Sequence, residues 1–72
     1  MAWTLQQIID INGRERIIQY ARVVKHTRMD LVNGEITVRY IEVLIMGKQR
    51  KWKEWYPFTD FMEANPRCKI DD

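Results

Sequence analysis

The 72-residue chain has few of the residues that cross-link small proteins or carry out covalent catalysis. Cys68 is the only cysteine, so the chain can form neither an intrachain disulfide nor a thiolate zinc cluster. His26 is the only histidine and there is no serine, which excludes the Ser–His pair of hydrolases and the ligand spacing of a metal site. We therefore expect a protein without enzymatic activity, metal or cofactor, in a reducing, cytoplasmic location.

Long apolar runs are also missing. No stretch approaches the roughly 20 apolar residues that a membrane helix requires, and the first residues lack the charged and apolar regions of a signal peptide. A chain of this length can bury one small core. We predict a soluble protein with no membrane partner and a single domain over residues 1–72, with a flexible tail from about residue 66 to 72.

What the chain does have is a segregated positive charge. The net charge of +2 conceals a central segment, from Arg14 to Lys53, with ten Lys or Arg against four Asp or Glu. A basic surface on a soluble protein usually faces phosphates or an acidic partner. The charge distribution therefore favours a binding protein.

Asn33-Gly34 is the strongest structural signal, because it separates two long runs rich in β-branched and aromatic residues. This dipeptide is typical of a two-residue hairpin loop, and such a loop would fix the strand register. In that register Arg28 lies opposite Arg39, and Lys25 lies opposite Glu42. The two arginines would repel each other, and an anionic partner could relieve the repulsion.

Further elements follow this hairpin. Gly47-Lys48 can turn the chain again, so that residues 50–56 form a third strand that ends at Pro57. Thr59 or Asp60 can then cap a short helix.

The N-terminal segment fits two structures. Trp3-Thr4-Leu5-Gln6-Gln7 has the form of a capping box with a hydrophobic staple, which predicts a helix over about residues 5–10. The alternative is a hairpin around Asn12-Gly13, which would place Asp10 opposite Glu15. We favour the helix because this like-charge pair would destabilise the hairpin.

These elements together predict an α+β fold. It consists of a small antiparallel β-meander of three to four strands, as a twisted sheet or small barrel, with one or two short helices.

Cations alternate with large aromatic rings between Lys48 and Tyr56. If Trp52 and Tyr56 face inward, strand alternation places Trp55 outward with the neighbouring lysines. An exposed tryptophan there could stack on unpaired bases or anchor a protein interface. The candidate binding residues are Arg14, Arg16, Arg22, Arg28, Arg39, Lys48, Arg50, Lys51, Lys53 and Trp55. The alternative is a solvated charged face balanced by neighbouring acids.

In its small size, low cysteine content and basic, aromatic character, the chain resembles small phage-encoded proteins that bind host RNA polymerase and inhibit initiation or promote antitermination. The resemblance covers general character over the whole chain and no diagnostic motif, so no functional residue is carried over from it. It implies a non-enzymatic transcription regulator in the host cytoplasm, with RNA polymerase as protein partner and DNA or RNA near its basic face. The alternatives are a direct DNA- or RNA-binding small barrel, of the Sm-like, SH3-like or OB-like kind, and a structural assembly subunit.

Overall fold

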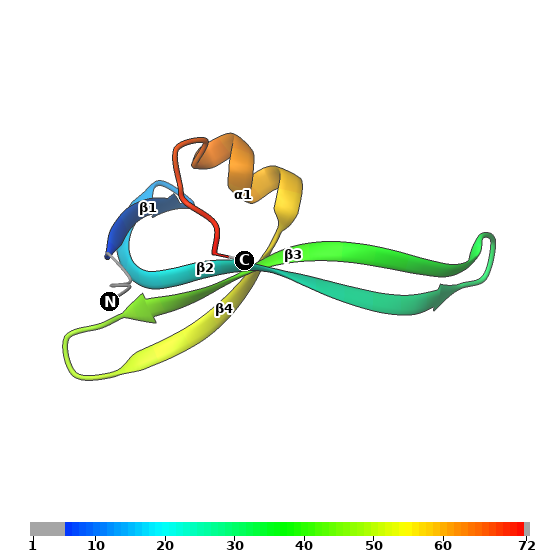
Figure 1. Ribbon diagram of the computed structural model, residues 1–72, viewed down its shortest axis with the longest axis horizontal. Coiled ribbons are helices and arrows are strands. Elements are labelled where there is room, and N and C mark those ends of the chain that lie inside the picture. The colour runs from blue at the N-terminus through cyan, green and yellow to red at the C-terminus, as the bar shows by residue number, and fades with distance from the viewer. Residues whose placement is uncertain (1–5, 72) are drawn as a thin grey trace.

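The computed structural model describes residues 6–71. In chain order they form β1 (Gln7–Ile11), β2 (Arg14–Asp30), β3 (Gly34–Met46), β4 (Lys51–Pro57) and α1 (Phe58–Ala64). Each strand pairs antiparallel with the next, and the resulting sheet curls so that α1 lies over its concave side (Figure 1). The predicted α+β meander is confirmed, with four strands and, within residues 6–71, one helix.

The N-terminal segment forms a hairpin, and the predicted helix over residues 5–10 is wrong. Asn12 and Gly13 have φ angles of 53° and 80°, as in a two-residue hairpin turn. The like-charge pair of Asp10 and Glu15 is present. Asp10 Oδ1, however, accepts the Gly13 N–H at 2.9 Å, so the carboxylate that we expected to oppose the turn stabilises it. Thr4 and Trp3, the predicted capping residue and one half of the staple, lie outside the described residues, and Ile8, the other half, is exposed on β1.

The long hairpin of β2 and β3 is confirmed, but its loop has three residues, Leu31–Asn33, and the predicted two-residue loop is wrong. Gly34 pairs with Asp30, and its φ of 76° is the left-handed position that completes a three-residue loop. Asp30 Oδ1 accepts the N–H groups of Val32 and Asn33 at 2.7 and 3.2 Å. The Asp30 carboxylate therefore stabilises the longer loop.

The longer loop shifts the register by three residues, and an odd shift changes which residues share a face of the sheet. Arg28 does not lie opposite Arg39, which pairs with Lys25. Glu42, expected opposite Lys25, lies opposite Arg22. Both predicted cross-strand pairs are therefore wrong, and the like-charge pair of this hairpin is Lys25 with Arg39.

The core occupies only one half of the sheet. An irregularity between Ile18 and Tyr20 shifts the register of β2 and keeps apolar side chains on the concave face on both sides of it. Trp52 and Tyr56 pack partly buried against this core, so the condition on which the outward position of Trp55 was predicted is met. The buried apolar side chains are Ile9, Ile18, Ala21, Ile41, Val43, Ile45 and Phe61.

Helix α1 follows β4 directly. It begins at Phe58, with Pro57 as the residue before it and no side-chain capping bond, so the predicted cap by Thr59 or Asp60 is wrong. Pro57 has a φ of −54°, which leads from the strand into the helix without an intervening polar residue.

The segment after α1, which we expected to be flexible, lies against the sheet as far as Asp71. The buried Asn65 side chain accepts the Asp10 N–H at 2.6 Å and donates to the Asp10 carbonyl at 2.9 Å. The Gln7 side chain likewise accepts the Lys69 N–H at 2.8 Å and donates to the Lys69 carbonyl at 2.9 Å. The Asp71 N–H donates to a β2 carbonyl at 2.6 Å. These bonds tie the end of the chain to β1 and β2.

Beyond the covered half of the sheet, β2 and β3 continue as a two-stranded projection (Figure 1). β1 pairs with β2 only up to Ile18, and β4 pairs with β3 only from Tyr40. We refer to residues 25–39 as the arm. No other strand or helix of residues 6–71 pairs with it.

Candidate functional site

A buried carboxylate lies on the convex face of the sheet. Glu42 of β3 is only 4% exposed. From β2, Arg22 Nε and the Tyr20 hydroxyl donate to its Oε2 at 2.7 and 2.9 Å. From β4, Trp55 Nε1 donates to its Oε1 at 2.9 Å. Donors from both neighbouring strands thus use both carboxylate oxygens.

This geometry keeps Glu42 ionised. The Trp55 indole N–H contributes most to lowering the pKa of Glu42 to about 2, and burial opposes it by raising the pKa. The hydrogen bonds from Arg22 and Tyr20 lower the pKa of Glu42 further. The hydrogen bond to Glu42 raises the pKa of Arg22 in turn. A stable ion pair therefore underlies this face.

The groups around Glu42 that reach solvent are mainly cationic and aromatic, and the exposed Asp71 forms a β-bridge with Arg22 at the open edge of β2. The Arg22 side chain is 53% exposed and Trp55 is 50% exposed. The Trp55 ring stacks on Tyr40, with 5.8 Å between ring centroids and 28° between planes. Lys53 lies two residues before Trp55 on the same face and is exposed. We refer to Tyr20, Arg22, Tyr40, Glu42, Lys53 and Trp55 as the convex patch.

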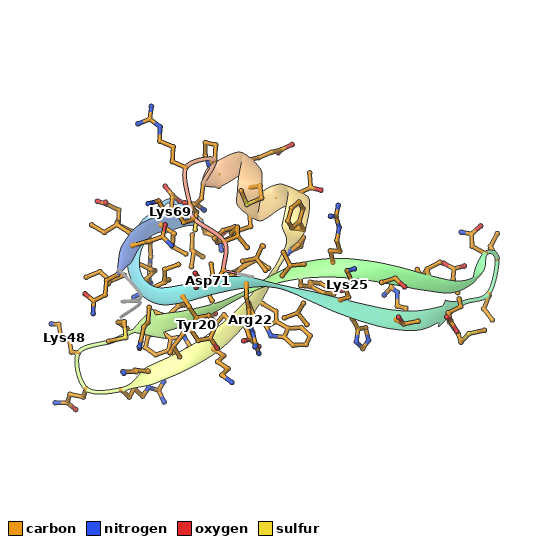
Figure 2. All side chains as sticks on the ribbon, viewed as in Figure 1. Tyr20, Arg22, Lys25, Lys48, Lys69 and Asp71 are labelled. Atoms are coloured by element: carbon orange, nitrogen blue, oxygen red, sulfur yellow. The ribbon has the colours of Figure 1, made fainter. Side chains whose placement is uncertain are left out.

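Tyr20 and Arg22 lie next to each other in this patch on β2 (Figure 2). The Arg22 Cζ is 5.7 Å from the centroid of the Tyr20 ring. Next to the patch, Lys51 donates to Gln19 Oε1 at 3.1 Å. The predicted outward orientation of Trp55 together with Lys51 and Lys53 is confirmed.

The other predicted binding residues are dispersed. Arg28 lies on the same face as Arg22, about 20 Å further along the arm at ~3.3 Å per residue. Arg39 lies on the opposite face, with its Cζ 4.5 Å from the centroid of the Phe58 ring. Of these three candidate arginines, Arg22 and Arg28 thus share a face of the sheet, and Arg39 does not. Arg14 is exposed beside the first hairpin turn.

A second basic group surrounds the turn between β3 and β4. Arg16, Lys48, Arg50 and Trp52 line a shallow hollow of about 560 Å³. The Arg50 Cζ is 5.4 Å from the centroid of the Trp52 ring. Figure 2 shows Lys48 at this turn, far from Lys25 on the arm. The hollow is therefore a basic site apart from the arm.

The described residues contain no metal-binding or membrane-spanning element. Within residues 6–71 no group of three or more His, Cys, Asp or Glu could hold a metal ion. None of their helices has the length and apolar character needed to cross a membrane. Cys68 packs against the core, and burial and then the Asp71 carboxylate raise the pKa of its thiol, which disfavours the reactive thiolate.

Tyr20, Tyr40 and Glu42 were not among the predicted site residues. Glu42 was expected to form an ordinary cross-strand pair with Lys25. Its surroundings in the sequence held a signal, because it is the only charged residue between Ile41 and Ile45. A carboxylate in such a run requires hydrogen-bond partners when the strand is buried.

Comparisons with protein-family models, with curated proteins and with solved structures found no significant match. The resemblance to phage proteins that bind RNA polymerase therefore stays a prediction.

Proposed function

We propose that the protein is a non-enzymatic nucleic-acid-binding protein and that its convex patch binds a single strand of RNA or DNA. The burial of Glu42 is the observation that supports this most. A surface carboxylate would repel phosphates, whereas this one lies beneath its neighbours and is paired with Arg22. The patch therefore presents cations and an aromatic ring to an approaching strand.

The chemistry of these groups suits an unpaired strand. Stacking of a base on an aromatic side chain contributes about 1–3 kcal/mol and tolerates any base. Trp55, half exposed and held by Tyr40 and Glu42, offers a fixed ring for such stacking. Lys53 and Arg22 beside it can contact the phosphates on either side of the stacked base. A duplex would hide its bases from this ring, so we favour a single strand.

The same chemistry is compatible with the predicted docking on nucleic-acid machinery, where the patch would contact a strand held by a larger complex. We favour direct binding over docking on a larger complex because direct binding needs only groups on the convex face.

Fluorescence anisotropy with labelled oligothymidylate and oligouridylate of about 16 nucleotides tests the proposal. Replacement of Trp55 by Leu should weaken binding about tenfold, because the stacking ring is lost. Trp55→Phe keeps a ring but loses the N–H to Glu42, and it should retain most of the affinity. The difference between the two variants shows whether Trp55 acts by stacking on a base or by supporting Glu42.

A matched pair of lysines tests the electrostatic part. Lys53→Ala should lower the slope of log affinity against log salt by about 0.7, as expected for one phosphate contact on a single strand. Lys25→Ala, an exposed lysine on the opposite face of the sheet, should leave the slope unchanged. The proposal fails if the wild-type chain does not bind either oligonucleotide at low salt, or if the two lysine variants behave alike.

A further inference from the structure

The tip of the arm is apolar, and the proposed nucleic-acid site does not use it. Met29, Leu31 and Val32 are 76%, 106% and 88% exposed. We propose that this tip inserts into an open cavity of a second copy of the same chain, between β1, β4 and α1, so that the protein self-associates through its arms. This inference goes beyond the proposed function and does not depend on it.

The arm has the properties of an element that needs a partner. A two-stranded hairpin is marginally stable in water when nothing covers it. Within residues 6–71 both edges of the arm lack a neighbouring strand, and unpaired edges readily pair with another chain. The tip is nevertheless well defined, because Asp30 accepts two loop N–H groups, and the Thr27 and Thr37 hydroxyls lie 3.2 Å apart.

A cavity that suits the tip lies on the same chain. It has a volume of about 160 Å³. A cavity of about 150 Å³ can hold a benzene ring, so this one has room for the four side-chain carbons of Leu31. Its walls include the apolar residues Ile11, Tyr56, Pro57 and Phe61 and, besides these, Asp10 and Asp60.

Charge also matches the arm to the cavity. Behind its tip the arm carries the exposed cation Arg28 on one face, and Lys25 and Arg39 lie further back on the other face, which also carries Glu35. The cavity has the exposed acids Asp10 and Asp60. Opposite charges around an apolar contact guide association and fix its orientation.

The charges of the arm also favour a protein cavity, rather than nucleic acid or a bilayer, as the binding site of the tip. Glu35 is an exposed acid beside the tip, opposite Met29, on the face of the arm away from Arg28. In a nucleic-acid groove phosphates would meet both faces of the arm, Glu35 included, and anionic lipid would repel it as well. In the cavity only one face needs to meet Asp10 and Asp60. Two copies that exchange arms reciprocally form two identical contacts and close the assembly.

Analytical ultracentrifugation of the full chain, from low micromolar to about 1 mM, tests this inference. Self-association should appear as concentration rises. The double variant Leu31→Ser with Val32→Ser should weaken it at least about tenfold by removing the apolar tip. Ala64→Arg, an exposed position that lines the cavity, should do the same by filling it. Ile8→Ser is the matched control: Ile8 is 67% exposed and does not line this cavity, so its replacement should leave association unchanged.

Mixing the two defective variants gives the sharpest test. The tip variant still has an intact cavity, and the Ala64→Arg variant still has an intact tip. Each alone should be monomeric, whereas the mixture should form a heterodimer through one restored contact. Circular dichroism of each variant checks that it remains folded.

A wild-type chain that stays monomeric up to about 1 mM overturns the inference. So does association that is indifferent to both variants, or a monomer whose tip binds duplex DNA or anionic vesicles. Binding to single strands, measured in parallel, should not respond to the tip variants. The two proposals therefore fail separately.

Discussion

β2 and β3 run through two regions that differ in what covers them. In the packed half, Ile41, Val43 and Ile45 of β3 are 0–1% exposed beneath α1 and between neighbouring strands. In the arm, the same strand continues with Ile36 and Val38, which are only half-buried, and it ends at an exposed apolar loop. β-branched residues alternate through both regions, so a strand pattern alone does not tell a core from an interaction surface. The packed half is a core because α1, β1 and β4 cover it or pair with it, and within residues 6–71 no other strand pairs with the arm.

Truncation of one isoleucine in each region should show the difference between the packed half and the arm most clearly. Ile41→Ala should lower the free energy of unfolding by about 3 kcal/mol, because it removes fully buried methyl groups and leaves a cavity. Ile36→Ala, the same change on the same strand, should lower it by less than about 1 kcal/mol. Urea unfolding followed by circular dichroism measures both.

Domains of this size have only a few kcal/mol of stability, so Ile41→Ala could prevent folding. The matched pair Ile41→Val, with an expected loss of about 1 kcal/mol, and Ile36→Val, with a smaller loss, then keeps the comparison measurable. Equal losses at the two positions would mean that the arm is as well packed as the core.

Glu42 should give the next largest effect, because its buried carboxylate accepts hydrogen bonds from both neighbouring strands in the packed half. Its folded pKa of about 2 lies below the ordinary value of 4.5. Its contribution to the free energy of unfolding is therefore complete above about pH 4.5 and is lost as the pH falls towards 2. Glu42→Gln should cost about 1–2 kcal/mol at neutral pH, since an amide accepts hydrogen bonds less strongly than a carboxylate.

Unfolding measured from pH 7 to about pH 2 checks this prediction. The variant should lose most of the acid dependence that Glu42 causes, so the difference between the two proteins should shrink as the pH falls. A difference that stays constant with pH would show that the charge of Glu42 is not what stabilises the patch.

The elements of the fold could be predicted from the sequence more readily than their register. Asn33-Gly34 predicts a hairpin because both loop lengths need a left-handed residue at or near the glycine. The choice between the two lengths depends on Asp30, whose carboxylate bonds to two loop N–H groups. The residues that form these bonds are neighbours in the sequence. The energy of these bonds, however, has to be compared with the energy of all the strand pairs that each loop length would form. An error of three residues there reassigned every cross-strand partner.

The N-terminus and the convex patch show the same limit. Repulsion between Asp10 and Glu15 was a valid reason against a hairpin, and the Asp10 bond to Gly13, together with the contacts of Asn65 far along the chain, outweighs it. Alternation along β4 predicted the outward position of Trp55, because one strand suffices for that inference. The partners of Trp55 come from β2 and β3, and only the correct register brings Arg22 and Glu42 together.

The smallest expected effect concerns the like-charge pair of the arm. Lys25 lies directly opposite Arg39, and like charges at such positions destabilise a sheet. Lys25→Glu should therefore raise the free energy of unfolding by about 0.5 kcal/mol at low salt, and Lys25→Gln by a smaller amount, because it removes repulsion without adding attraction. Both gains should fade as salt screens the pair. The measurement is urea unfolding at low and high salt, at concentrations where the chain is monomeric. In the predicted register Lys25 would have paired with Glu42, and Lys25→Glu would then destabilise the protein, so the sign of this small effect distinguishes the two registers.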